Sequence, residues 1–157
     1  MSARFRLYSA VILLVGAAGC GGGTTPAAPT ASDSFLAGRW TGTVTIEHEG
    51  EATTSGQMTW TFETVAGTNL QTFKVTIQSQ HTWLPITTTV TSAITPSNTP
   101  PARISTQGDY ASPRGCTGSL LSVGTATATR IDGDLTGVDC TTLLHSTFRG
   151  SVVLTKG

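Results

Sequence analysis

The stretch Trp40–His48 reads WTGTVTIEH, and its side chains alternate in character along its whole length. One set of alternate positions is Trp40, Gly42, Val44, Ile46 and His48, and the other is Thr41, Thr43, Thr45 and Glu47. A period of two is typical of a strand with one face in a core and the other in solvent. The stretch therefore predicts a half-buried β-strand.

The same alternation returns in three later segments. Residues 57–65 place Met58, Trp60 and Phe62 on one face, residues 73–78 place Phe73, Val75 and Ile77 together, and residues 146–154 do the same with Phe148, Val152 and Leu154. We expect further strands over 86–94, 102–106, 120–130 and 135–140, with 108–115 irregular and Asp132-Gly133 as a hairpin turn. Trp83, close to Pro85, is expected at the rim in a loop.

These segments add up to about eight strands, and no stretch of the sequence keeps the 3.6-residue period of a helix. We therefore predict an all-β fold, a single antiparallel up-and-down barrel, with a β-sandwich as the alternative. Only 11% of residues are charged and the formal net charge is +0. Since nucleic-acid binding needs a basic surface, we expect no nucleic-acid partner.

The N-terminus has the pattern of an export signal. Arg4 and Arg6 precede an apolar run over 7–18. In a helix that run would span roughly 18 Å, against roughly 30 Å for the hydrocarbon core, so it suits a signal peptide and is too short to span a membrane. The run ends Ala17-Ala18-Gly19-Cys20, which resembles the lipobox of bacterial lipoproteins.

That resemblance implies cleavage after Gly19 and lipid on Cys20. It implies an exported protein held to the cell envelope through Cys20, in the outer membrane where the cell has one, because Gly21 stands where an aspartate would favour inner-membrane retention. Residues 20–34 are rich in Gly, Thr, Pro and Ala, and we expect a flexible linker there. The predicted parts are thus a signal peptide at 1–19, a lipidated linker at 20–34 and a barrel domain at 35–157.

A second resemblance concerns the barrel. Gly38-Arg39-Trp40 is similar to the Gly-x-Trp opening of the calycins, the lipocalin and avidin barrels. In that family a basic residue near the end of the last strand packs across the tryptophan. The resemblance implies that Arg149 contacts Trp40 at the closed end.

With Cys20 lipidated, Cys116 and Cys140 remain as a pair in an exported domain, where a disulfide is the default. A redox-active pair is the alternative, although no Cys-x-x-Cys occurs. The Cys116–Cys140 bond would pin the 108–115 segment to the C-terminal hairpin.

Chemical motifs are scarce. His48, His81 and His145 share no metal-ligand spacing, and turn chemistry explains the aspartates at 132, 134 and 139 better than calcium does. No serine-nucleophile or phosphate-binding motif occurs. We therefore expect no enzyme, no metal and no cofactor.

Two functions stay open. The barrel would bind a small apolar ligand or lipid in a cavity lined by Trp60, Phe62, Phe73 and Phe148. Alternatively, it is a structural or interaction lipoprotein with a filled core, acting through its surface and loops on an unidentified envelope partner. An enzyme, the least favoured class, would need at least two of the histidines and aspartates to meet in one cleft.

Overall fold

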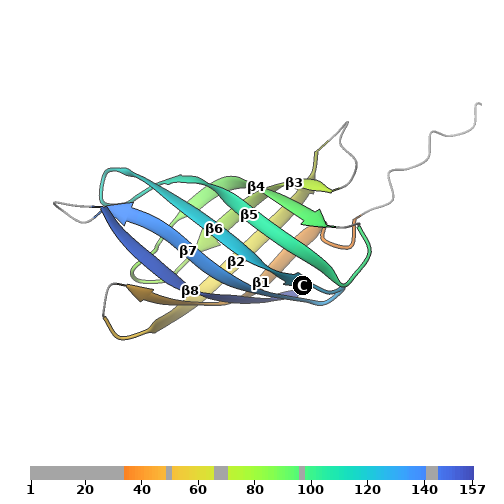
Figure 1. Cartoon of the computed structure of the whole chain (residues 1–157), viewed down its shortest axis with the longest axis horizontal. Coiled ribbons are helices and arrows are strands. Elements are labelled where there is room, and N and C mark those ends of the chain that lie inside the picture. The colour runs from red at the N-terminus through yellow and green to blue at the C-terminus, as the bar shows by residue number, and fades with distance from the viewer. Residues whose placement is uncertain (1–33, 49–50, 66–70, 96–97, 141–144) are drawn as a thin grey trace, which may run out of the picture. The chain divides into compact units, whose positions relative to one another are not determined.

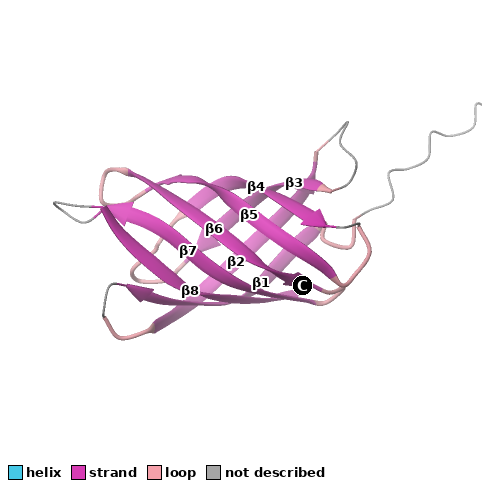
Figure 2. Cartoon of the chain, viewed as in Figure 1, coloured by secondary structure: helices cyan, strands magenta, loops and turns pink. Residues whose placement is uncertain are grey.

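A computed structural model describes residues 34–48, 51–65, 71–95, 98–140 and 145–157. Cys20 and the predicted signal and linker, apart from Ser34, lie outside them. Eight antiparallel strands form one closed barrel in chain order, which confirms the predicted fold class (Figures 1 and 2). The strands are β1 (Gly38–His48), β2 (Thr54–Thr64), β3 (Thr72–Ser79), β4 (Thr87–Thr95), β5 (Ala102–Ala111), β6 (Thr117–Ala126), β7 (Arg130–Cys140) and β8 (His145–Lys156).

The barrel closes because β1 pairs on both sides. Its register with β8 runs from Trp40 opposite Lys156 to His48 opposite Phe148. A row of paired residues can be followed round the barrel from Gly38 on β1, opposite Phe62 on β2. The row passes through every strand and arrives back on β1 at His48, at the other end of that strand. This stagger tilts the strands against the barrel axis, as closure requires. Closure leaves no exposed sheet edge.

The alternating positions predicted from the sequence point inward. The inward set on β1 to β3 is large and includes Trp40, Trp60, Phe62 and Phe73, all at most 2% exposed. Other strands place glycine beneath an aromatic ring. A Cβ on Gly118 would lie 2.3 Å from the ring of Tyr110, and one on Gly137 would lie 2.3 Å from the ring of Phe148. Large side chains therefore fill the space that small ones leave, and the interior packs as one core.

Two local predictions need correction. The segment 108–115 was expected to be irregular, which is right for 112–115 but wrong for 108–111, where β5 continues to Ala111. Asp132-Gly133 was expected to form a hairpin turn, yet both residues lie inside β7. The turn comes earlier, where the backbone N–H of Thr127 donates to the carbonyl of Arg130 and the Thr127 hydroxyl accepts from the Arg130 N–H. The hydrogen bonds of Thr127 therefore fix the position of the turn, and the Asp-Gly pair does not.

We call the barrel end near Leu36 and Lys156 the base, and the end with the β1–β2, β3–β4, β5–β6 and β7–β8 connections the top. At the base the Trp40 indole N–H donates to the Leu36 carbonyl at 2.8 Å, and the Lys156 ammonium donates to the Phe35 carbonyl at 2.6 Å. The described residues contain no helix that is long and apolar enough to cross a membrane.

The predicted contact between Trp40 and Arg149 is wrong. The basic residue over the Trp40 ring is Lys156, whose Nζ lies 5.5 Å from the ring centroid. Arg149 stands opposite Glu47 in the β1–β8 ladder, near the other end of β1, and its exposed guanidinium pairs with that carboxylate at 2.7 Å. Arg149 also points outward, because it is one position away from the inward Phe148 and Gly150.

Candidate functional site

The β3–β4 connection, residues 80–86, folds over the top of the barrel. His81 is fully buried and holds this connection in place. Its Nδ1 accepts the backbone N–H of Trp83 at 3.1 Å, so Nε2 carries the proton and donates to the Thr54 hydroxyl at 3.0 Å. Both ring nitrogens are thus used, which assigns His81 a structural role.

Trp83 contacts three other side chains at the top of the barrel. Its ring lies 4.2 Å from that of His48 in a tilted stack and 5.3 Å from that of Phe148 in an edge arrangement. The guanidinium of Arg114, from the β5–β6 connection, lies 4.6 Å from the Trp83 ring centroid. We call these four residues the Trp83 cluster. Trp83 is half-buried in a loop, as predicted for a rim residue.

A buried ion pair orients Arg114. Its Nη1 lies 2.7 Å from Asp139 Oδ2, and the Asp139 side chain is 0% exposed. The second Arg114 terminal nitrogen donates to the Trp83 carbonyl at 3.1 Å. The other Asp139 oxygen accepts the backbone N–H of Cys140 at 2.7 Å. A buried carboxylate held by a cation and an amide needs no further charge to balance it.

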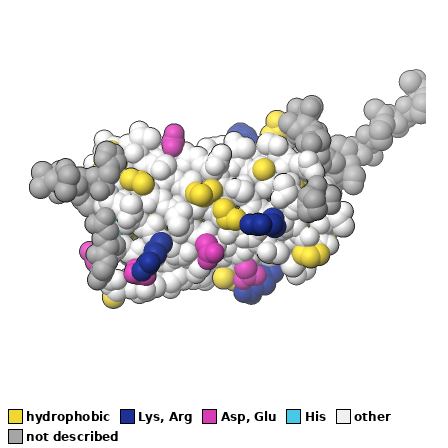
Figure 3. All heavy atoms as spheres, viewed as in Figure 1, with side chains coloured by type: hydrophobic (Ala, Val, Ile, Leu, Met, Phe, Trp, Pro, Cys, Tyr) yellow, Lys and Arg dark blue, Asp and Glu magenta, His cyan; other side chains and the backbone are white. Residues whose placement is uncertain are grey.

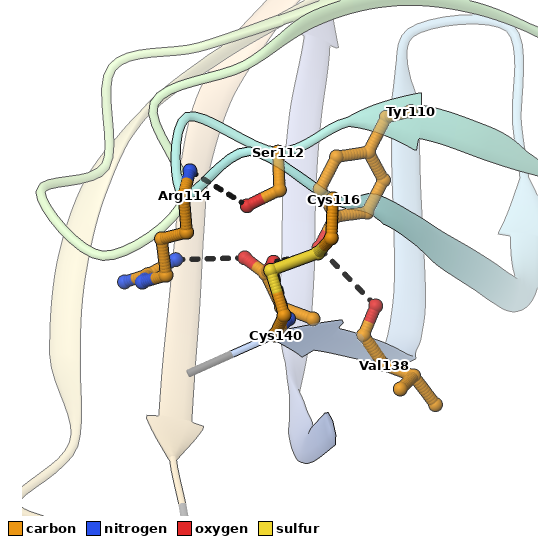
Figure 4. Close-up of a disulfide and its surroundings, with 7 residues drawn as sticks. Tyr110, Ser112, Arg114, Cys116, Val138 and Cys140 are labelled. Atoms are coloured by element: carbon orange, nitrogen blue, oxygen red, sulfur yellow. Dashed lines mark hydrogen bonds and ion pairs between the residues drawn. A yellow bond between two sulfur atoms is a disulfide. The ribbon is translucent and has the colours of Figure 1, made fainter. Parts of the chain in front are cut away.

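The predicted disulfide between Cys116 and Cys140 is present beside this pair (Figure 4). It joins the residue just before β6 to the last residue of β7. The sulfurs and a carboxylate oxygen of Asp139 lie within 4.8 Å of one another, and among the described residues this is the one group of three potential metal ligands at that spacing. Because the sulfurs are bonded to each other, neither is the thiolate that a metal would need.

Tyr110 packs against the same corner, and its hydroxyl donates to the Val138 carbonyl at 3.4 Å (Figure 4). Burial raises the pKa of Tyr110 well above its ordinary value of 10.0, and the negative charge of Asp139 raises it further. The phenol therefore stays neutral and serves as a packing and hydrogen-bonding group.

His48 differs from His81 in its environment. Its Nε2 is hydrogen-bonded to the hydroxyl of Ser146, a buried residue at the start of β8. Its Nδ1 is buried without a hydrogen-bond partner and lies 3.9 Å from a carboxylate oxygen of Glu51. The turn after β1 places Glu51 there, because the Glu51 N–H donates to the His48 carbonyl at 2.7 Å.

The four predicted ligand-lining residues do not come together as one set. Trp60, Phe62 and Phe73 lie in one aromatic group with Trp40, with successive ring centroids 6.0 to 6.4 Å apart. Phe148 instead contacts Trp83 at the top. The rings of the first group pack on one another inside the barrel.

An open hollow lies on the outer face of the barrel, and Phe148 of the Trp83 cluster is among its lining residues. It crosses β4 to β8 and is bordered by the exposed Glu47–Arg149 pair, with Leu121, Gln107 and Thr136 along its floor. Figure 3 shows that much of this side carries neither charged nor apolar side chains. The hollow offers hydroxyl and amide groups but no cluster of reactive ones.

Sequence reasoning did not single out Arg114 or Ser146, and it treated Asp139 only as one of three scattered acids. A signal was available for two of them, since Arg114 and Asp139 each lie within two residues of a disulfide cysteine. Asp132 and Asp134 point outward, whereas Asp139 points inward, so the three aspartates form no shared site. For Ser146 no local signal exists.

Comparisons of the chain with protein-family models, with curated proteins and with solved structures found no match.

Proposed function

We propose that this chain is a cell-envelope lipoprotein, anchored by lipid on Cys20, whose barrel has a filled core and acts through its top. The proposed location in the cell rests on residues 1–20, which have the charged start, short apolar run and lipobox-like end described above. The mode of action depends on the barrel. One observation carries it: the aromatic side chains that would line a ligand cavity pack on one another.

The residue types at the top support an interaction role. Tryptophan and arginine are among the side chains that most often dominate binding energy at interfaces, and the Trp83 cluster brings together one of each from two neighbouring connections. The disulfide and the Arg114–Asp139 pair tie the β5–β6 connection to the end of β7, which restrains it. A rigid surface loses little conformational entropy on binding a partner.

One observation favours the second candidate, binding of a small ligand inside the barrel. Trp60 is 0% exposed, and its indole N–H has no hydrogen-bond partner. A ligand with one acceptor group and an apolar body would satisfy it.

Metabolic labelling with a palmitate analogue tests the anchor. We expect label on the wild-type protein and on Cys116→Ser, and none on Cys20→Ser. If Cys20→Ser keeps its label and its membrane association, the lipoprotein assignment is wrong.

Native mass spectrometry of the mature protein, released gently in detergent, separates the two binding modes. A filled core predicts the mass of the lipidated chain alone. A discrete additional mass that disappears on denaturation would instead establish the interior-ligand function.

Photo-cross-linking in cells tests the top. The exposed Glu51 lies at the top and the exposed Glu63 lies near the base end of β2, so they are matched sites for a photoreactive residue. We expect one defined adduct from position 51 and none of that mass from position 63. Equal adducts from both positions would contradict action through the top.

A further inference from the structure

At the top, three side chains lie in a row, with the ring of His48 between the Ser146 hydroxyl and the Glu51 carboxylate. The histidine Nε2 is hydrogen-bonded to the Ser146 hydroxyl, and its Nδ1 faces the Glu51 carboxylate at 3.9 Å. The stacked Trp83 ring holds the imidazole plane. Such a hydroxyl–imidazole–carboxylate order is recognised by geometry and roles, on any fold and in any chain order.

Activation of the Ser146 hydroxyl requires His48 to carry its proton on Nδ1. A proton on Nδ1 would face the Glu51 carboxylate at 3.9 Å and leave Nε2 free to accept the Ser146 proton. His81 has the opposite pattern, because its Nδ1 accepts a backbone N–H. Of these two imidazole rings, the one of His48 is hydrogen-bonded to a serine hydroxyl, that of Ser146, and the one of His81 to the Thr54 hydroxyl.

We propose that Ser146 is a nucleophile activated by His48 and that it cleaves small carboxylic esters. The Ser146 oxygen attacks the ester carbonyl carbon while its proton passes to His48 Nε2. The carbon–oxygen bond to the alcohol breaks, and the alcohol leaves with that proton. Water then gives a proton to His48 and attacks the acyl-serine, which releases the carboxylic acid and returns the proton to Ser146.

The surroundings define the substrate class. Phe148 and Trp83 provide aromatic walls beside His48, which suits an apolar acyl or aryl group. Ser146 is 2% exposed, so part of its surroundings must move before an ester reaches it. The Trp83 ring stacks on the His48 ring that contacts Ser146, so we expect Trp83 to limit entry and the substrate to be small.

Glu51 is a positioning residue, because it acts through His48. Its carboxylate favours the Nδ1-protonated form and stabilises the imidazolium that forms when Ser146 is deprotonated. Its charge is the functional property, so Glu51→Gln removes the effect and Glu51→Asp restores part of it.

A fluorophosphonate probe tests the proposal on the full-length mature protein, with the adduct mapped by peptide mass spectrometry. We expect modification at Ser146 in the wild type, faster modification in Trp83→Ala, and none in Ser146→Ala. His48→Gln should slow the reaction about 10²-fold or more. Glu51→Gln should slow it less, and Glu51→Asp should recover part of the loss.

Ser112→Ala is the matched control, since Ser112 is a second buried serine at the top whose hydroxyl accepts only a turn N–H, that of Arg114. Its reaction rate should equal that of the wild type. The absence of an adduct at Ser146 in both the wild type and Trp83→Ala overturns the proposal. An unchanged rate in a folded, disulfide-bonded His48→Gln variant overturns it as well. Neither result bears on the anchor or on the filled core, which labelling and native mass spectrometry test separately.

Discussion

Lys156, opposite Trp40 in the ladder that closes the barrel, lies over the Trp40 ring and donates to the carbonyl of Phe35. One side chain at the end of β8 therefore ties together the last strand, the first strand and the segment before it. Arg149, the basic residue expected in that place, lies outside the barrel with Glu47.

Replacing Lys156 tests this contact. Lys156→Ala should lower the free energy of unfolding by about 1 kcal/mol, because a cation–π contact and a charge-assisted hydrogen bond are lost. Denaturant titration measures the change. Arg149→Ala is the matched control, and an exposed ion pair contributes little to stability. A larger loss for Arg149→Ala than for Lys156→Ala would reverse our assignment of the closing residue.

The disulfide should stabilise the barrel through the unfolded chain. The double variant Cys116→Ser with Cys140→Ser should lose about 3 kcal/mol, the scale that loop-closure entropy gives for a loop of this size. Thermal unfolding of wild type, reduced wild type and the double variant measures the loss. If the reduced wild type unfolds at the same temperature as the oxidised form, the bond adds nothing.

The Arg114–Asp139 pair should be sensitive to loss of one partner. Asp139→Asn leaves Arg114 beside a buried site without its counter-charge and should cost about 3 kcal/mol. Asp132→Asn, which breaks the exposed pair with Arg130, is the control and should change stability little. Equal effects in the two variants, read from denaturant titrations, would show that Asp139 is not buried as described.

High pH should destabilise the fold through Tyr110. Its pKa is raised in the folded state, chiefly by burial, so the unfolded chain releases the phenol proton first. The stabilisation is complete below pH 10 and is lost as the pH rises above 10, at no more than about 1.4 kcal/mol per pH unit. Stability measured against pH should show this slope in the wild type and lose it in Tyr110→Phe. An identical slope in both proteins would assign the effect to other groups.

Much of the barrel was predictable because its cause is local. The alternation over Trp40–His48 needs only neighbouring residues to define which face is apolar, and β1 follows that pattern inward and outward. The disulfide was predicted because two cysteines remain once Cys20 is assigned to lipid in a chain that we expect to be exported. The turn before β7 was missed because the Thr127 side chain, and not the Asp-Gly pair, completes its hydrogen bonds.

By itself the sequence determined the fold class, the number of strands and the inward set of side chains, since a period of two is a property of the strand. Only the tertiary structure decided which distant residues meet. His48 and Ser146 are 98 positions apart, and Arg114 and Asp139 are 25 apart. Their contacts, like the choice of Lys156 over Arg149, depend on the register and stagger of the closed ladder. Register results from packing the whole interior at once, and no short stretch of sequence contains it.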